Sequence, residues 1–165
     1  MQSIVYKNVN TAEYCDVNQS ERHNTQTKTR KSFEFKNAMV SSPNATGGKL
    51  NIKFFTLMPG KTNYPYHYHT GAEEVFYIIS GTATLKTPDG DRIVTEGDVV
   101  VFPANENGAH QLTNTSDDAL VYLDISTVSS PDVLFFPDKD DFRIITPNVT
   151  KSFSLNTEVN YLRNE

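Results

Sequence analysis

Three of the four histidines in this chain lie in two short segments that glycines frame, and one segment also carries a suitably spaced glutamate. The residues are His67, His69, Glu74 and His110. Neutral imidazoles and a carboxylate are ligands of divalent transition metal ions, and four of them leave positions open on an ion that prefers five or six ligands. The sequence therefore predicts one metal site, for Fe, Mn, Ni, Co, Zn or Cu.

The spacing of these residues indicates how their side chains converge. His67 and His69 are two positions apart, so on an extended segment both imidazoles project from the same face. Glu74 follows beyond a glycine-containing bend, and Phe76 shares its face along the next expected strand. His110 comes much later and must arrive on a different strand. We therefore expect a site built by two parts of the fold, with Phe76 as a pocket residue.

Other side chains are candidates for the surroundings of the site. Tyr122 and Asp124 occupy alternate positions of an expected strand and so share one face, from which they could orient a metal-bound imidazole. Lys53 is the best placed cation for a phosphate group, with Lys61 and Arg92 next, although no glycine-rich phosphate loop accompanies them. No catalytic residue can be assigned from the sequence.

The elements that must position these groups are short strands. From about residue 33, runs rich in β-branched and aromatic residues alternate with Gly, Pro, Asn and Asp clusters, and no amphipathic helix of ten residues is visible. The expected core strands are Leu50 to Met58, Glu74 to Ile79, Thr82 to Thr87, Asp91 to Val94, Asp98 to Phe102, His110 to Asn114 and Leu120 to Ile125. This pattern is typical of an all-β sandwich or barrel.

A length of 165 residues suits one domain. We expect a polar N-terminal arm with an edge strand over residues 1–47, a barrel over 48–128 and an extension over 129–165. The extension carries an apolar patch at Val133 to Phe136 and strand-like pieces at Phe142 to Ile145 and Ser152 to Leu155. These pieces, or a short strand around Ile4 to Tyr6, could pair at a sheet edge or with a second subunit. We therefore expect a homodimer.

Composition excludes several classes of partner. The net charge is −5 and the densest basic run is only Lys28, Arg30 and Lys31, which argues against nucleic acid. No apolar stretch approaches the length of a membrane span, and no secretory leader is visible at the N-terminus. The single cysteine, Cys15, has no partner for a disulfide. We expect a cytoplasmic protein whose partner is a small molecule, without a membrane.

The residues of the two segments resemble the paired motifs of the cupin superfamily. The matching patterns are Gly60(x)6His67-x-His69(x)4Glu74(x)6Gly81 and Gly97(x)5Pro103(x)4Gly108-x-His110(x)3Asn114. The resemblance covers roughly Leu50 to Ser126. It implies a double-stranded β-helix, a barrel like a jelly roll, in which the three histidines and the glutamate bind one metal ion. The stretches after Pro103 and around Phe136 also resemble small single-domain bacterial cupins of undefined activity.

Two classes of function follow from this interpretation. The first is a metalloenzyme that acts on a small polar molecule. With iron it would be a dioxygenase of an enol, diol or thiol, and with manganese, nickel or zinc it would be an isomerase of a sugar or sugar phosphate. The second is a non-catalytic, metal-dependent module that binds or senses a small ligand.

Overall fold

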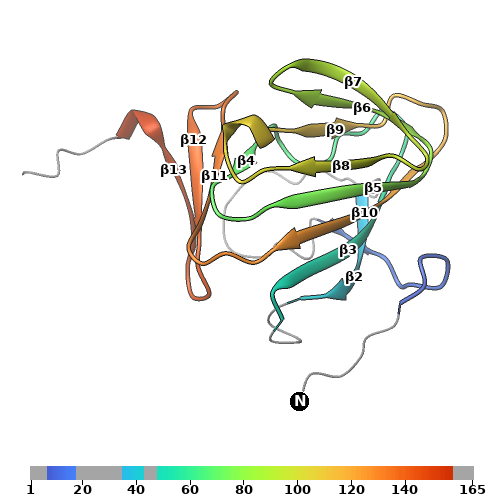
Figure 1. Cartoon of the computed structure of the whole chain (residues 1–165), viewed down its shortest axis with the longest axis horizontal. Coiled ribbons are helices and arrows are strands. Elements are labelled where there is room, and N and C mark those ends of the chain that lie inside the picture. Colours follow the sequence, from blue (N-terminus) through green and yellow to red (C-terminus); the bar gives the residue numbers. More distant parts are fainter. Residues whose placement is uncertain (1–6, 18–34, 43–47, 158–165) are drawn as a thin grey trace, which may run out of the picture.

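Short antiparallel strands form nearly all of the regular structure in the computed structural model, which describes residues 7–17, 35–42 and 48–157. The largest sheet has the order β1-β2-β3-β10-β5-β8, and a three-stranded sheet has the order β7-β6-β9 (Figure 1). The strands of the larger sheet are β1 (Cys15–Asp16), β2 (Phe35–Ser41), β3 (Leu50–Leu57), β10 (Leu120–Thr127), β5 (Glu74–Ser80) and β8 (Val99–Phe102). Those of the smaller sheet are β7 (Gly90–Thr95), β6 (Thr82–Thr87) and β9 (Gln111–Thr113). The predicted all-β fold is confirmed.

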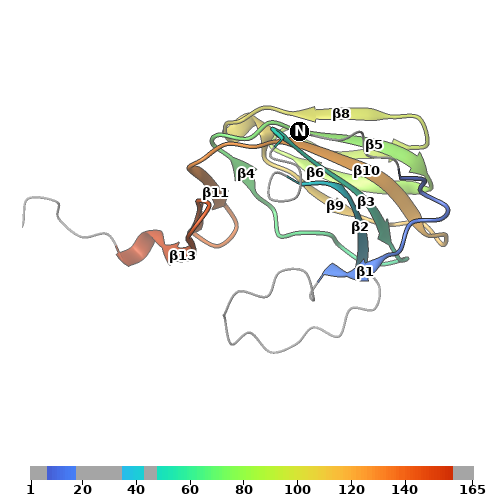
Figure 2. The ribbon, with the colours of Figure 1, turned by 90° about the horizontal axis from the view of Figure 1, so that it is seen from below.

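A third sheet, with four strands, joins the end of the chain to the barrel. Its order is β13-β12-β11-β4, and its strands are β13 (Thr150–Ser154), β12 (Asp141–Ile145), β11 (Asp132–Phe136) and β4 (Tyr68–His69). Figure 2 shows β11 and β13 beside the two other sheets. Because β11 pairs with β4 through Leu134 and His69, the C-terminal sheet is attached to a strand that carries a predicted metal ligand.

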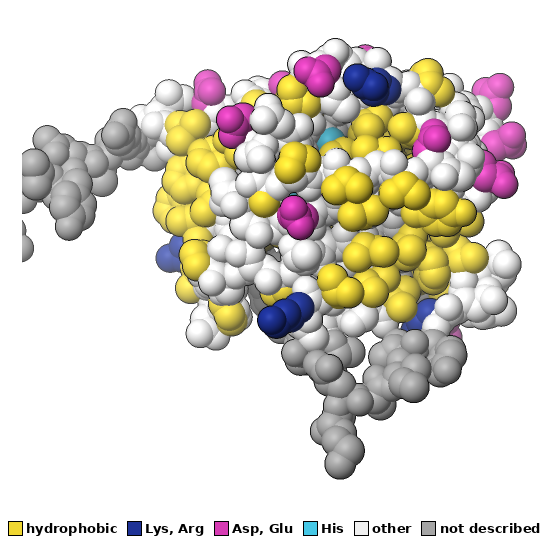
Figure 3. Space-filling view, in the orientation of Figure 1, with side chains coloured by type: hydrophobic (Ala, Val, Ile, Leu, Met, Phe, Trp, Pro, Cys, Tyr) yellow, Lys and Arg dark blue, Asp and Glu magenta, His cyan; other side chains and the backbone are white. Residues whose placement is uncertain are grey.

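The outer face of the six-stranded sheet is rich in hydrophobic side chains. In the orientation of Figure 1, Figure 3 shows them gathered over β3, β10, β5 and β8. Val99 and Val101 on the outer strand β8 are each 62% exposed, and Tyr77 on β5 is 41% exposed. Such a contiguous apolar surface is a feature of faces that contact another molecule.

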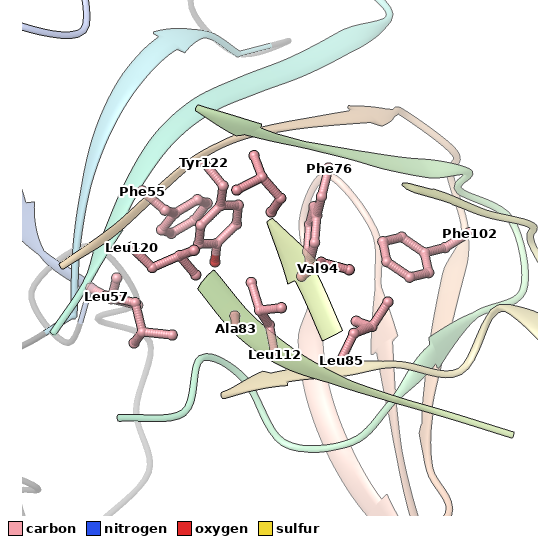
Figure 4. Close-up of a cluster of buried hydrophobic side chains, with 12 residues drawn as sticks. Phe55, Leu57, Phe76, Ala83, Leu85, Val94, Phe102, Leu112, Leu120 and Tyr122 are labelled. Carbon is pink, nitrogen blue, oxygen red and sulfur yellow. The ribbon is translucent and has the colours of Figure 1, made fainter. Parts of the chain in front are cut away.

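The hydrophobic core lies between the two barrel sheets (Figure 4). Strict alternation places Phe76 and Ile78 of β5 and Tyr122 of β10 in this core, while their neighbours in sequence face outward. The ring of Tyr122 stacks on Phe55 of β3 with centroids 5.1 Å apart. Buried rings of this kind contribute large apolar areas to the core.

The structure agrees with the expected strands and adds others. All seven expected core strands are present, with ends shifted by at most two residues. The patch Val133 to Phe136 is part of a strand, β11. Strand β2 pairs with β3, and β1 pairs with β2 at the edge of the sheet; no strand with the bounds of β1 or β2 was expected. The short strand expected around Ile4 to Tyr6 lies outside the described residues. Two 3-10 turns, η1 (Glu106–Gly108) and η2 (Leu155–Thr157), are the helical elements of the described residues.

Gly108, at the end of η1, provides a test of how the backbone before His110 is held. A Cβ atom at Gly108 would lie 2.1 Å from the backbone oxygen of Pro103. We predict that Gly108→Ala lowers the free energy of unfolding by about 3 kcal/mol, because two backbone segments must separate. The control Gly60→Ala has a φ of +70° but no heavy atom within 4 Å, so it should lose only about 1 kcal/mol. Equal losses in urea unfolding would contradict the prediction.

Candidate metal centre

Strands from separate parts of the chain position the four predicted ligands. Glu74 is the first residue of β5 in the six-stranded sheet, and His69 is the last residue of β4. His67 and His110 face each other in an isolated antiparallel bridge, in which each backbone N–H donates to the other carbonyl at 3.2 and 2.9 Å. This bridge continues the pairing of the three-stranded sheet and brings the second segment against the first.

The four side chains meet at one place. One ligand atom each of His67, His69 and Glu74 lies within 4.8 Å of the others, so these three groups could together hold a metal ion. The Nε2 atom of His110 lies 3.2 Å from Oε2 of Glu74, and Nε2 of His69 lies 3.8 Å from the same oxygen. The structure therefore brings all four predicted ligands together. That they bind an ion is a proposal, which we develop below.

Backbone carbonyls set the tautomers of two of the imidazoles. Nδ1 of His67 lies 2.8 Å from the Pro65 carbonyl oxygen, and Nδ1 of His110 lies 2.9 Å from that of Gly108. A carbonyl oxygen can only accept, so in both rings the proton is on Nδ1 and the lone pair is on Nε2. Both Nε2 lone pairs are thus available to a metal ion.

A carboxylate from the C-terminal sheet has the same effect on His69. Nδ1 of His69 donates to Oδ2 of Asp132 at 2.5 Å, and the backbone N–H of Gly71 donates to Oδ1 at 3.0 Å. Asp132 is only 5% exposed. Such a carboxylate orients the imidazole and makes it a better ligand. No motif in the sequence predicted Asp132; the only signal is the alternation of Asp132, Leu134 and Phe136, which share one face of β11.

Two buried atoms of the site, Oε2 of Glu74 and Nε2 of His110, have no hydrogen-bond partner among the described residues. Their separation of 3.2 Å is short, but with the His110 proton on Nδ1 both atoms present lone pairs and repel each other. A divalent cation between them would satisfy both. The chemistry of these residues therefore fits a bound metal ion.

The electrostatics of the site favour the protonation states that a metal requires. Burial, followed by the charge of His110, lowers the pKa of His67 to about 4, so this imidazole is neutral at neutral pH. Burial alone would raise the pKa of Glu74, but the hydrogen bond and positive charge that His110 supplies when its ring is doubly protonated, followed by the charges of His69 and His67, outweigh burial and hold the pKa below its ordinary value. The site thus offers a neutral imidazole at His67 and an ionised carboxylate at Glu74, whereas Asp132 and Glu74 outweigh burial and raise the pKa of His69 above its ordinary value.

Aromatic rings enclose the ligands. The ring of Phe102 stacks on the imidazole of His110 with centroids 3.8 Å apart, and the ring of Phe76 stands perpendicular to the same imidazole with centroids 5.2 Å apart. On the C-terminal side, Phe136 stacks on His67 at 6.1 Å. These contacts fix the imidazole planes and separate them from solvent. Phe76 was expected near the site, whereas Phe102 and Phe136 were not assigned to it.

Tyr122 and Asp124 lie on the inner face of β10, as the alternation predicted. Burial, and then the charge of Glu74, raise the pKa of Asp124 well above its ordinary value. Lys53, which pairs with Asp124 across the sheet, lowers that pKa, so the two side chains face the same interior. Asp124 is therefore a carboxyl group close to the site but outside the set of four.

Comparisons with known proteins support the predicted barrel fold. Residues 53–126 match the family model of the cupin domain. A suggested sugar phosphate isomerase from Acidithiobacillus ferrooxidans has a similar structure with a TM-score of 0.67 and 26% identity, over 78% of this chain and 82% of that one. A sugar phosphate isomerase of the cupin superfamily from Silicibacter pomeroyi has a similar structure with a TM-score of 0.75 and 16% identity, over 91% of this chain and 92% of that one.

A third similar structure is a predicted oxalate decarboxylase from Thermotoga maritima, with a TM-score of 0.53 and 25% identity, over 58% of this chain and 81% of that one. No curated protein matches the sequence. The family model therefore identifies residues 53–126 as a cupin domain, and the fold of the similar structures agrees with this. Separately, none of the helices among the described residues is long and apolar enough to span a membrane.

Removal of a ligand should empty the site without unfolding the barrel. We predict that His67→Ala and His110→Ala each lose the bound metal, measured by elemental analysis after dialysis against chelator-treated buffer. Circular dichroism should show the strand content of the parent protein. Metal retained at full stoichiometry in either variant would contradict the assignment of the ligands.

Asp132 should affect metal affinity although it does not touch the ion. We predict that Asp132→Asn weakens metal binding by about 10- to 100-fold, because His69 loses the charged acceptor that orients it. Titration with Zn²⁺ against a competing chelator measures this. The control Asp138→Asn removes an exposed carboxylate that pairs with Lys86 at 2.7 Å, and its affinity should be unchanged. Equal affinity for the parent protein and Asp132→Asn would refute this role.

Proposed function

We propose that this protein is a metal-dependent enzyme of a small, polyhydroxylated molecule, in which His67, His69, Glu74 and His110 hold one divalent transition metal ion. The observation that carries the proposal is that the imidazoles lie around the buried carboxylate of Glu74. Oε2 of Glu74 and Nε2 of His110 face each other, and neither has a hydrogen-bond partner among the described residues. Four protein ligands leave positions open on an ion that prefers five or six. A substrate with two adjacent oxygens fits these positions.

Isomerisation of a sugar or sugar phosphate is the activity that we favour. When bound, the ion would polarise a carbonyl or hydroxyl oxygen and so acidify the adjacent C–H bond. The suggested sugar phosphate isomerase of similar fold, at 26% identity, supports this choice. Among the residues of this chain, Asp124 and Tyr122 are placed to hold or move a proton, since both are buried on the inner face beside Glu74.

The surroundings of the site suit this chemistry. Phe76, Phe102 and Phe136 limit the access of water to the ligands, which strengthens electrostatic interactions at the reacting atoms. The hydroxyl of Tyr122 has no hydrogen-bond partner in the described residues and its pKa is raised, first by burial and then by the charge of Asp124. It therefore remains protonated at neutral pH and can donate to a substrate oxygen.

Two alternatives remain proposals with separate outcomes. A dioxygenase would use the same ligands with iron and would consume oxygen together with its substrate. A non-catalytic module would bind a small ligand without changing it.

A homodimer is also proposed, supported by the apolar outer face that Val99, Val101 and Tyr77 occupy. The cytoplasmic location stays a prediction.

The reaction class can be tested without a known substrate. Protein purified without chelators is analysed for metals and then incubated in D₂O with aldoses and ketoses of three to six carbons, with and without phosphate. We predict deuterium incorporation next to the carbonyl carbon, seen by NMR, that requires metal and is lost in His67→Ala. Binding of a sugar without exchange would favour the sensing module, and oxygen uptake by an iron-containing sample would favour the dioxygenase.

A further inference from the structure

The inner face of the C-terminal sheet places an arginine near the proposed metal centre. Arg143 lies in the middle of β12, where the register aligns it with Leu134 of β11 and Ser152 of β13. Leu134 is itself aligned with His69 of β4. Aligned residues of neighbouring antiparallel strands project from the same face, so Arg143 is on the face of the sheet that carries His69.

An aromatic ring connects Arg143 to the site. The guanidinium carbon of Arg143 lies 5.8 Å from the ring centroid of Phe136, within the range of a cation–π contact. Phe136 in turn stacks on the imidazole of His67 with centroids 6.1 Å apart. The positive charge is therefore two ring contacts from a proposed ligand.

The guanidinium group is oriented but its charge is not balanced. Nε of Arg143 donates to Oγ of Ser152 at 3.2 Å, which fixes the plane of the group. Its two terminal amino groups make no hydrogen bond to the described residues, and Arg143 forms no ion pair with them. Asp141 lies on the same face of β12 but does not approach within ion-pair distance. The group thus keeps a pair of parallel N–H donors for another partner.

Two other cations of the barrel, Lys53 and Lys86, differ from Arg143 in their surroundings. Lys53, the cation that the sequence favoured for phosphate, faces Asp124 across the sheet and lowers the pKa of that carboxyl group. Lys86 pairs with Asp138 at 2.7 Å. Unlike Lys86, Arg143 forms no ion pair within the described residues, and unlike Lys53 it contacts the ring that packs on His67.

We propose that Arg143 binds an anionic substituent, a phosphate or a carboxylate, at the end of the substrate remote from the metal ion. The planar guanidinium matches two oxygens of either group and forms paired, charge-assisted hydrogen bonds with them. This proposal rests on the proposed function, because it needs the metal ion to hold the other end. It makes the C-terminal sheet a specificity element of the barrel.

A matched set of sugars tests the proposal. Metal-loaded protein is titrated by calorimetry with glucose, glucose 6-phosphate and glucuronate, which differ only at carbon 6. We expect at least one anionic sugar to bind more tightly than glucose. Arg143→Gln should weaken the binding of that sugar about 10- to 100-fold, leave glucose unchanged and retain the metal. Arg143→Lys should restore part of the loss, since it keeps the charge but not the paired donors.

The control is Arg92→Gln. The sequence named Arg92 after Lys53 as a cation for phosphate, but β7 exposes its side chain, so the substitution should change none of the affinities. Whichever anionic sugar depends on Arg143 identifies the group as phosphate or carboxylate. If the parent protein binds no metal, the proposed function is refuted, and the role of Arg143 that depends on it is refuted as well. If metal is bound but glucose and both anionic sugars bind equally, or Arg143→Gln binds as the parent protein does, the role of Arg143 is refuted.

Discussion

The arrangement depends on the hydrogen bond that each imidazole donates through Nδ1. The acceptors are the Pro65 and Gly108 carbonyls and the Asp132 carboxylate, and each places the proton on the outer nitrogen of its ring. Consequently the inner nitrogens of the neutral rings carry lone pairs, and these nitrogens lie around the ionised Glu74. Buried acceptors that face one another cost about 1–3 kcal/mol each when they lack a partner. A cation that binds only the folded chain would remove this cost and stabilise the fold.

The rest of the architecture holds these rings in place. The bridge between His67 and His110 joins the two motif segments, and alternation along β5 and β10 directs Glu74, Phe76 and Asp124 to one interior. The chain after the barrel is equally part of the site. Through β11 it supplies the carboxylate that orients His69 and the ring that packs on His67, so the C-terminal sheet and the ligands support each other.

The glycine-framed motifs were enough to predict which four side chains lie close together, because a cluster of imidazoles at alternate positions needs a defined backbone path. The period of two was enough to predict the core strands and the inner face of β10. Asp132 could not be predicted, since its hydrogen bond to His69 spans 63 positions and depends on the pairing of β11 with β4. Arg143 was missed for a related reason: its place near the site follows from the register of three tail strands, which the sequence does not specify.

The central claim is that one metal ion binds the Nε2 atoms of three histidines and the carboxylate of Glu74. The most direct measurement is anomalous diffraction at the absorption edge of the metal that the purified protein retains. The account predicts one peak per chain, within bonding distance of Nε2 of His67, His69 and His110 and of an oxygen of Glu74. A peak elsewhere, coordination through Nδ1, or well-ordered side chains without a peak after reconstitution would contradict it.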